Sequence, residues 1–140
     1  MPVRHNNKGR SKSGSPFLQL HWFMLESEAW GCLTANARAV YLEVARRYNG
    51  KNNGFLALSV RDAAERCRIN KDTAKRALDE LQRLGFIECA VAGGFSLKVR
   101  HASEWRLTVA RCDRTGGRET KAFMRWRPEP PSEKKITVPK

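Results

Sequence analysis

The residues of this sequence best suited to recognition chemistry are cations near the start of one predicted helix, residues 71–84. Its buried face is predicted by apolar residues at helical spacing, namely Ala74, Ala77, Leu78, Leu81 and Leu84. Most cations of the opposite face lie in its first two turns; that face carries Lys71, Asp72, Thr73, Lys75, Arg76, Asp79 and Arg83. The unpaired backbone N–H groups at a helix start also attract phosphate. This face therefore suits a polyanion, and the donors of Lys75 fit the O6 and N7 acceptors of guanine.

The charge of the whole chain supports the same class of partner. Its 140 residues include 27 Lys and Arg against 14 Asp and Glu, a net charge of +13. Nucleic acid is the leading candidate for such a field, and an anionic membrane surface is the next. The most apolar stretch, residues 17–25, is interrupted by Gln19 and His21 and is too short to span a membrane. Sixteen mostly polar residues precede it, which does not suit a signal peptide. We expect a cytoplasmic protein, bacterial and nucleoid-associated, with no membrane partner.

The cysteines give no indication of a metal site or a disulfide framework. They are Cys32, Cys67, Cys89 and Cys112. No pair has C-x-x-C spacing and no histidine clusters with them, so we expect reduced thiols, with Cys67 and Cys89 as small core groups. Gly-rich phosphate loops, H-E-x-x-H and the nucleophile elbow do not occur. Tyr41 and Tyr48 fall on the inward face of a predicted helix. We therefore expect no enzyme activity and no cofactor.

Periodicity and capping residues predict the elements that hold the cationic face. An irregular piece and a short helix around 26–32 precede a helix that Thr34 caps and Asn49-Gly50 ends. The apolar face of this helix is predicted by the spacing of Ala37, Val40, Tyr41, Val44, Ala45 and Tyr48. A strand at 55–58, a helix at 60–67 capped by Ser59 and the helix 71–84 capped by Asn70 follow, and Gly85 closes the last helix.

Beyond Gly85, the pattern predicts a β-hairpin. Strands 86–92 and 95–100 are joined by a tight Gly93-Gly94 turn, and another strand covers 104–109. Residues 110–126 are expected to dock through Phe123, Met124 and Trp126. Residues 1–16 form a basic disordered tail, 17–126 the folded domain and 127–140 a Pro/Lys-rich tail.

This order of elements is that of a winged helix-turn-helix. The predicted fold class is thus α+β, mainly helical, with a three-helix core and a β-hairpin wing. The stretch SVRDAAERCRINKDTAKRALDELQRLGFI, residues 59–87, resembles the DNA-binding domain of GntR-type regulators and the winged helices of plasmid and phage replication proteins. The stretch ASEWRLT, residues 102–108, is similar to the strand that ends the wing region in several of these proteins. The resemblance covers roughly 34–109. It departs at Arg68, where a glycine is frequent; arginine fits there only if the residue is not forced to positive φ.

The resemblance implies DNA-contacting roles for the positions matching Arg61, Lys71, Thr73 and Lys75. Our predicted site is larger and consists of Arg61, Asn70, Lys71, Thr73, Lys75, Arg76, Gly93, Gly94, Lys98 and Arg100. The glycines would let the wing approach the minor groove, with Lys98 and Arg100 near phosphates. Two plainer interpretations stay open: the cations form a solvated helix face, or the fold serves protein contacts alone. The tryptophans could stack on single-stranded bases, although core or dimer packing is the favoured interpretation.

Three functions are compatible with these observations. The first is a small transcriptional regulator that binds double-stranded DNA at a specific operator. The second is a plasmid or phage replication-initiation or accessory protein that binds origin repeats. The third is an architectural basic protein with little sequence preference. Expected partners besides DNA are a second copy of the chain, through residues 17–33 and 123–126, and the transcription or replication machinery.

Overall fold

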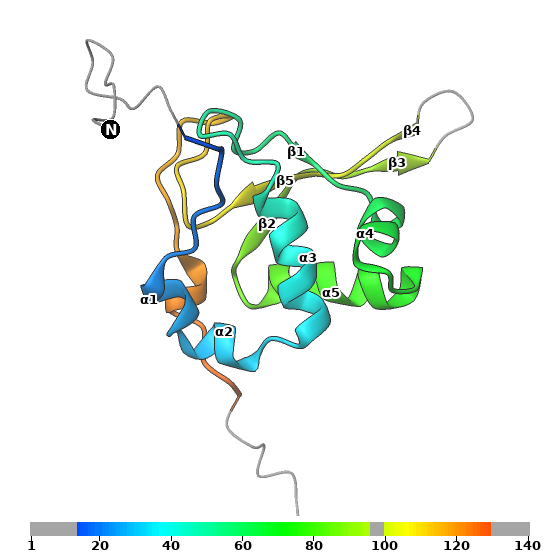
Figure 1. The fold of residues 1–140 in the computed structure, drawn as a ribbon. Coiled ribbons are helices and arrows are strands. Elements are labelled where there is room, and N and C mark those ends of the chain that lie inside the picture. The colour runs from blue at the N-terminus through cyan, green and yellow to red at the C-terminus, as the bar shows by residue number, and fades with distance from the viewer. Residues whose placement is uncertain (1–13, 96–99, 130–140) are drawn as a thin grey trace, which may run out of the picture.

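The computed structural model describes residues 14–95 and 100–129 of the chain (Figure 1). The helices are α1 (Trp22–Leu25), α2 (Glu28–Cys32), α3 (Ala35–Ala45), α4 (Val60–Cys67), α5 (Lys71–Arg83) and the 3₁₀ helix η1 (Ala122–Met124). The strands are β1 (Leu56–Ala57), β2 (Ile87–Val91), β3 (Gly94–Phe95), β4 (Arg100–His101) and β5 (Glu104–Leu107). The predicted fold class, α+β and mainly helical, is confirmed, and the predicted tails lie mostly outside the described residues.

The helices α3, α4 and α5 begin where their capping residues predict. The Oγ1 of Thr34 accepts from the Ala37 N–H at 3.2 Å, and the Oγ of Ser59 accepts from the Asp62 N–H at 3.0 Å. The Oδ1 of Asn70 accepts from the Thr73 N–H at 2.8 Å. Each bond satisfies a first-turn donor that has no partner within its helix, which contributes about 1 kcal/mol.

The predicted apolar stripes of these helices form the core. From α3 the buried residues are Ala37, Val40, Tyr41, Val44 and Ala45, and from α5 they are Ala74, Ala77, Leu78 and Leu81. The prediction that Asn49-Gly50 ends α3 was wrong, because the helix stops at Ala45. The Arg47 and Tyr48 N–H groups bond three residues back and tighten the chain into turns.

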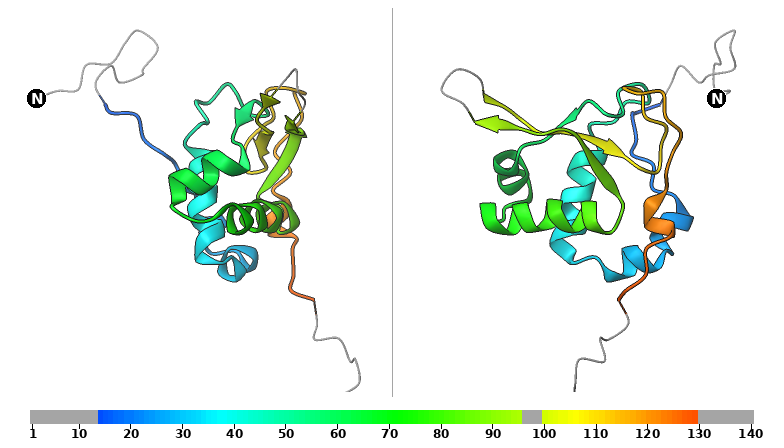
Figure 2. Two further views of the ribbon diagram at one scale, coloured as in Figure 1. Left: turned by 90° about the vertical axis from the view of Figure 1, so that its right-hand side faces the viewer. Right: turned by 180° about the vertical axis from the view of Figure 1, so that it is seen from behind.

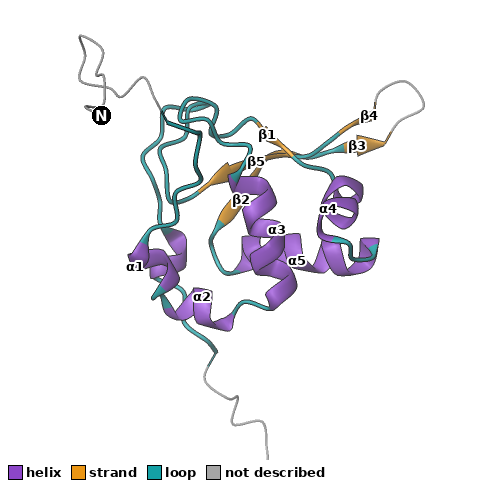
Figure 3. Cartoon of the chain, viewed as in Figure 1, coloured by secondary structure: helices purple, strands orange, loops and turns teal. Residues whose placement is uncertain are grey.

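Three antiparallel strands in the order β1-β5-β2 cover one side of the helices (Figure 3). Leu56 pairs with Trp105 and Ile87 with Leu107, so alternate residues of β5 face the core. The Trp105 Nε1–H donates to the Leu58 carbonyl at 2.9 Å. A bulge between Cys89 and Val91 then turns the pair β2 and β5 into the two-stranded ribbon β3-β4.

The prediction that Gly93-Gly94 forms the hairpin turn was wrong. Gly94 pairs with His101 and Phe95 with Arg100, so the two strands continue past the glycines and Phe95–Arg100 is not the returning strand. Neither glycine has the positive φ of a tight hairpin turn. Both lie where the strands approach closely: a Cβ on Gly93 would be 2.9 Å from the Ser103 nitrogen. These positions therefore require glycine because it has no side chain, and not because the backbone turns there.

Aromatic rings pack α2 and η1, the segments on either side of the helix-and-sheet core, against that core. Phe123 stacks on Phe86 with ring centroids 5.0 Å apart, and Phe86 packs edge-on against Trp30 and Tyr41. Gly85 has φ 87°, and a Cβ there would be 2.7 Å from the Phe123 nitrogen. The predicted C-terminal glycine therefore ends α5 and also lets η1 approach.

Three further predictions were wrong, two of them in these flanking segments. Trp22–Leu25 is helical rather than irregular. Met124 is exposed although Phe123 is buried and Trp126 packs on the core. Within the single turn of η1, residues 123 and 124 point to different sides, so only Phe123 faces the core. Cys89 is exposed and not a core group, since β2 is exposed after Ile87.

A buried asparagine joins the 50–55 loop to the chain after β5. The Nδ2 of Asn53 donates to the Leu107 and Arg111 carbonyls at 2.9 Å and to the Ala110 carbonyl at 3.2 Å. Its Oδ1 accepts from the Leu107 N–H at 2.7 Å. The side chain is fully buried with its hydrogen-bonding groups satisfied, so it holds the strand from which the ribbon extends.

Candidate nucleic-acid interface

Three elements project toward the same side of the molecule: α4, the start of α5 and the β3-β4 ribbon (Figure 1). Viewed from that side, the ribbon and α4 flank the start of α5 (Figure 2). Residues 68–70 join the two helices, and α4 packs directly against α5. The end of α5 that carries most of its cations is thereby left accessible beside the ribbon.

The cations on this side are exposed, as the helical spacing predicts. Arg61 lies in the first turn of α4, and Lys71 and Lys75 lie in the first turns of α5. Asn70 is the N-cap, so its Oδ1 is occupied by the Thr73 N–H and only its Nδ2 group is available to donate to DNA. Thr73 is only partly exposed. The structure therefore gives the predicted residues different capacities for contact.

Two of the cations have acidic partners one turn further along their own helix. The Nε of Arg61 lies 3.4 Å from Glu65 Oε1, and the Nζ of Lys75 lies 3.4 Å from Asp79 Oδ2. Both pairs are exposed, so each contributes at most about 1 kcal/mol and opens readily to another anion. These two ion pairs were not predicted from the sequence, although the i,i+4 spacing of their residues is the signal that indicates them.

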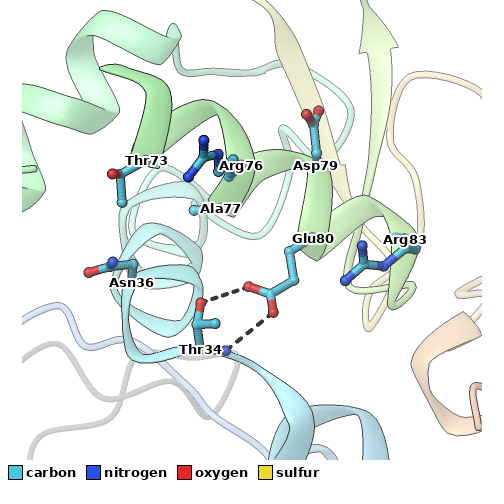
Figure 4. Close-up of a pocket in the computed structure, with 8 residues that line it drawn as sticks. All are labelled: Thr34, Asn36, Thr73, Arg76, Ala77, Asp79, Glu80 and Arg83. Carbon is cyan, nitrogen blue, oxygen red and sulfur yellow. Dashed lines mark hydrogen bonds between the residues drawn. The ribbon is translucent and has the colours of Figure 1, made fainter. Parts of the chain in front are cut away.

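Arg76 lies on a different flank of α5, beside a shallow hollow of about 580 Å³ (Figure 4). The start of α3 forms the other wall, with Thr34 and Asn36. Glu80 crosses between the helices: its Oε2 accepts from the Thr34 Oγ1–H at 2.7 Å, and its Oε1 accepts from the Thr34 N–H at 3.4 Å. This contact holds α5 on α3.

The ribbon is held by contacts across its two strands. The Gly93 N–H donates to Ser103 Oγ at 2.9 Å, and His101 Nε2 lies 3.1 Å from the Ala92 carbonyl oxygen. Arg100 is in β4, paired with Phe95. Lys98 lies outside the described residues. Of the predicted wing residues, Arg100 therefore lies in the ribbon, and Gly93 and Gly94 belong to its stem.

The helix pair itself is only mildly basic. Residues 59–84 hold seven Lys and Arg and five Asp and Glu. Cations and carboxylates alternate over this surface, so it differs from a uniformly positive one. Such a pattern favours partners whose donors and acceptors match it over any polyanion alike.

Other candidate chemistry finds no support in the described part of the chain. The Tyr41 hydroxyl lies 3.3 Å from Met24 Sδ, and burial raises the pKa of Tyr41 far above its usual value. Burial and the nearby Asp113 carboxylate raise the pKa of Tyr48. Neither tyrosine is set up as a nucleophile. Within residues 14–95 and 100–129, His, Cys, Asp and Glu side chains form no group of three that could hold a metal ion, and no helix there is long and apolar enough to cross a membrane.

Comparison with known proteins identifies the same region. Residues 31–87 match a family model described as a helix-turn-helix domain. The match begins in α2 and ends at the first residue of β2, so it includes α3, α4 and α5. Neither the search of curated proteins nor the search of solved structures found a match to this chain. Residues 31–87 are therefore similar to a helix-turn-helix domain, which supports DNA binding, and the mixed α+β fold with its ribbon is consistent with a winged helix-turn-helix.

Proposed function

We propose that this chain is a sequence-specific double-stranded DNA-binding protein that acts as a small transcriptional regulator. One observation carries the proposal: the exposed, cation-bearing start of α5 and the β3-β4 ribbon project toward the same side of a helix-turn-helix domain. Helices in this position enter the major groove with their first turns against the base edges. Lys71 and Lys75 are then the side chains nearest the bases, and the ribbon follows the backbone toward the minor groove.

The acidic partners on α4 and α5 favour a selective protein over an architectural one. Where Lys75 binds a guanine edge, Asp79 must release it, and the base supplies the replacement acceptors. On an unsuitable sequence the carboxylates repel phosphates and nothing replaces the lost pairing. A protein that binds all sequences equally would gain nothing from carboxylates that pair with its DNA-facing cations, as Glu65 and Asp79 do.

A replication-initiation or accessory protein is the second candidate. The ASEWRLT stretch, similar to wing strands of phage and plasmid proteins, forms β5 at the stem of the ribbon. In that role, binding would occur at repeats near an origin and the tails would contact the replication machinery. Both roles place the protein in the cytoplasm, with the nucleoid as its location.

Sequencing the fragments of sheared genomic DNA that the protein binds distinguishes the two roles and the architectural alternative. Enrichment of one palindrome at a promoter is the expected result. Arrays of direct repeats would assign the protein to replication, and a flat distribution would assign it to an architectural role.

Binding to duplex DNA is tested by titrating salt. If about six phosphates are neutralised, log K falls against log salt with a slope of about −5. A slope near zero, or equal binding of the protein to a neutral polymer, would contradict DNA binding.

A second copy of the chain is the partner we propose for the surface around α1. The exposed apolar residues there are Phe17, Trp22, Phe23 and Met124. Trp22 is 77% exposed to solvent. Two copies would double the base pairs that are contacted. Sedimentation at micromolar concentration, with and without DNA, is expected to show a dimer; a monomer in both conditions would contradict this assembly.

A further inference from the structure

Arg68 joins α4 to α5 in a backbone conformation that arginine disfavours. Its φ of 55° and ψ of 47° lie in the left-handed region, where Cβ crowds the following carbonyl oxygen. The sequence expectation that arginine would fit only without positive φ is therefore not met. Among the described residues, only Arg68 and Lys121 combine a side chain with positive φ.

The turn needs this conformation, but it does not need an arginine. The Arg68 N–H donates to the Glu65 carbonyl at 3.4 Å and the Ile69 N–H to the Ala64 carbonyl at 3.0 Å, which closes α4. Both bonds use backbone atoms alone. Glycine or asparagine would make them with less strain.

The fold does not use the guanidinium group either. Arg68 is exposed, and no carboxylate of the described residues lies within 4.0 Å of it. A cation near the end of α4 does stabilise the helix dipole. Arg66, in the last turn of α4, supplies that charge without a strained backbone.

We propose that Arg68 contacts a DNA phosphate beside the groove that α5 enters, and that the strained arginine is retained for this contact. The residue stands two positions before the N-cap Asn70, at the end of α5 that faces DNA under the proposed function, on which this inference rests. Strain retained at a binding site, with no internal contact to offset it, is a recognised mark of function. A phosphate at this place would also accept hydrogen bonds from the free first-turn N–H groups of α5.

The test is to replace Arg68 with residues that prefer the left-handed region but carry no charge. For Arg68→Asn we expect Tm to rise by about 2–5 °C, because the strain is relieved. Affinity for duplex DNA is expected to fall about five- to tenfold near 0.1 M salt, and the salt slope to become shallower by about one unit. The loss should be equal on selected and scrambled duplexes, because a phosphate contact positions without specifying. Arg68→Gly is the second variant and should show the same loss of affinity.

Lys121→Gly is the matched control. Lys121 is the other left-handed cation, with φ 45°, and it precedes η1 on the far side of the domain (Figure 1). This change removes the same charge and the same kind of strain, and DNA affinity should stay within about twofold of the parent, since no phosphate contact is lost.

Three results would contradict the proposed phosphate contact or the proposed function. Parent-like affinity and slope in both Arg68 variants would overturn the contact while leaving the proposed function intact. The Lys121 Nζ lies 4.9 Å from the centroid of the Phe23 ring, so sedimentation must show the assembly of Lys121→Gly to be that of the parent. An equal loss of affinity in that variant would then also overturn the contact, because net charge alone would explain the effect. Absence of salt-dependent duplex binding in the parent protein would instead contradict the proposed function itself.

Discussion

At the scale of single residues, Asn53 is the side chain whose replacement should cost most stability among the polar groups. Removing its amide leaves the Leu107 N–H and the carbonyls of Leu107, Ala110 and Arg111 without their partner. Buried groups left unpaired cost about 1–3 kcal/mol each, and partial relaxation lowers the sum. We expect Asn53→Ala to lower the free energy of unfolding by about 3 kcal/mol, measured by urea denaturation.

Asn52→Ala is the neighbouring control for this prediction. Asn52 is half-buried, and its side chain bonds the Arg47 carbonyl and the Asn49 N–H at the surface of the same loop. Its loss should cost about 1 kcal/mol, because water can replace these bonds. Equal losses of unfolding free energy in the two variants would show that the burial of Asn53 adds nothing to the stability that its hydrogen bonds provide.

Lys75 tests base recognition at the same scale. Its Nζ pairs with the exposed Asp79 and can exchange that acceptor for a guanine edge. Lys75→Ala should weaken the preference at one position of the selected site by about 1–3 kcal/mol while much of the non-specific binding remains. Competition between selected and scrambled duplexes measures the difference.

Arg83→Ala is the control for Lys75. It removes the same charge from the exposed surface of α5, two turns further from the start of the helix. We expect it to leave base preference unchanged. If the Lys75→Ala protein discriminates as well as the parent, Lys75 does not contact a base.

At the scale of elements, the ribbon depends on two strands that approach closely at a glycine. In Gly93→Ala the new Cβ would meet the Ser103 nitrogen at 2.9 Å and the His101 carbonyl oxygen at 3.0 Å, both backbone atoms. The strands must separate, which shifts the ribbon relative to α5. We expect DNA affinity to fall several-fold with little change in Tm, because the buried core ends before the ribbon begins.

Gly31→Ala separates this effect from a general cost of replacing glycine. A Cβ on Gly31, in α2, has nothing within 4 Å. The change should leave DNA affinity unchanged and slightly stabilise the helix. Parent-like DNA binding by Gly93→Ala would show that the ribbon does not contact DNA.

At the scale of the whole molecule, most of the positive charge lies outside the helix pair. Residues 59–84 contribute seven cations and five acids to a chain of net charge +13. Residues 1–14 contain Arg4, Lys8, Arg10 and Lys12 and no acid. Non-specific affinity should therefore come largely from segments other than the one that specifies sequence.

Deleting residues 1–14 tests this division. Affinity should fall on all duplexes alike, and the salt slope should become shallower by up to about 3–4 units, one for each cation removed. The deletion combined with Lys75→Ala should show both losses independently. A truncated chain that no longer distinguishes selected from scrambled duplexes would contradict the prediction, since the N-terminal segment would then contact bases itself.

What the sequence by itself determined are the features that depend on neighbours within one helical turn. The caps Thr34, Ser59 and Asn70, the buried stripes of α3 and α5 and the glycine that ends α5 were all predicted correctly. Each rests on a hydrogen bond or a periodicity that spans three or four residues, and these bonds form wherever such a helix is placed. The exposed cations of α4 and α5 follow from the same periodicity.

Only the tertiary structure decided the features that join distant parts of the chain. Gly93-Gly94 has the composition of a turn, yet pairing with residues 101–103 makes it part of a ribbon stem, because strand register is set by the partner strand. Asn53 bonds groups 54 to 58 residues further along the chain, which no local pattern reveals. Arg68 adopts its left-handed conformation because α4 must end and α5 must begin within three residues while both pack on α3. At Gly93-Gly94 and at Arg68, packing between distant segments outweighs a local preference of about 1–2 kcal/mol.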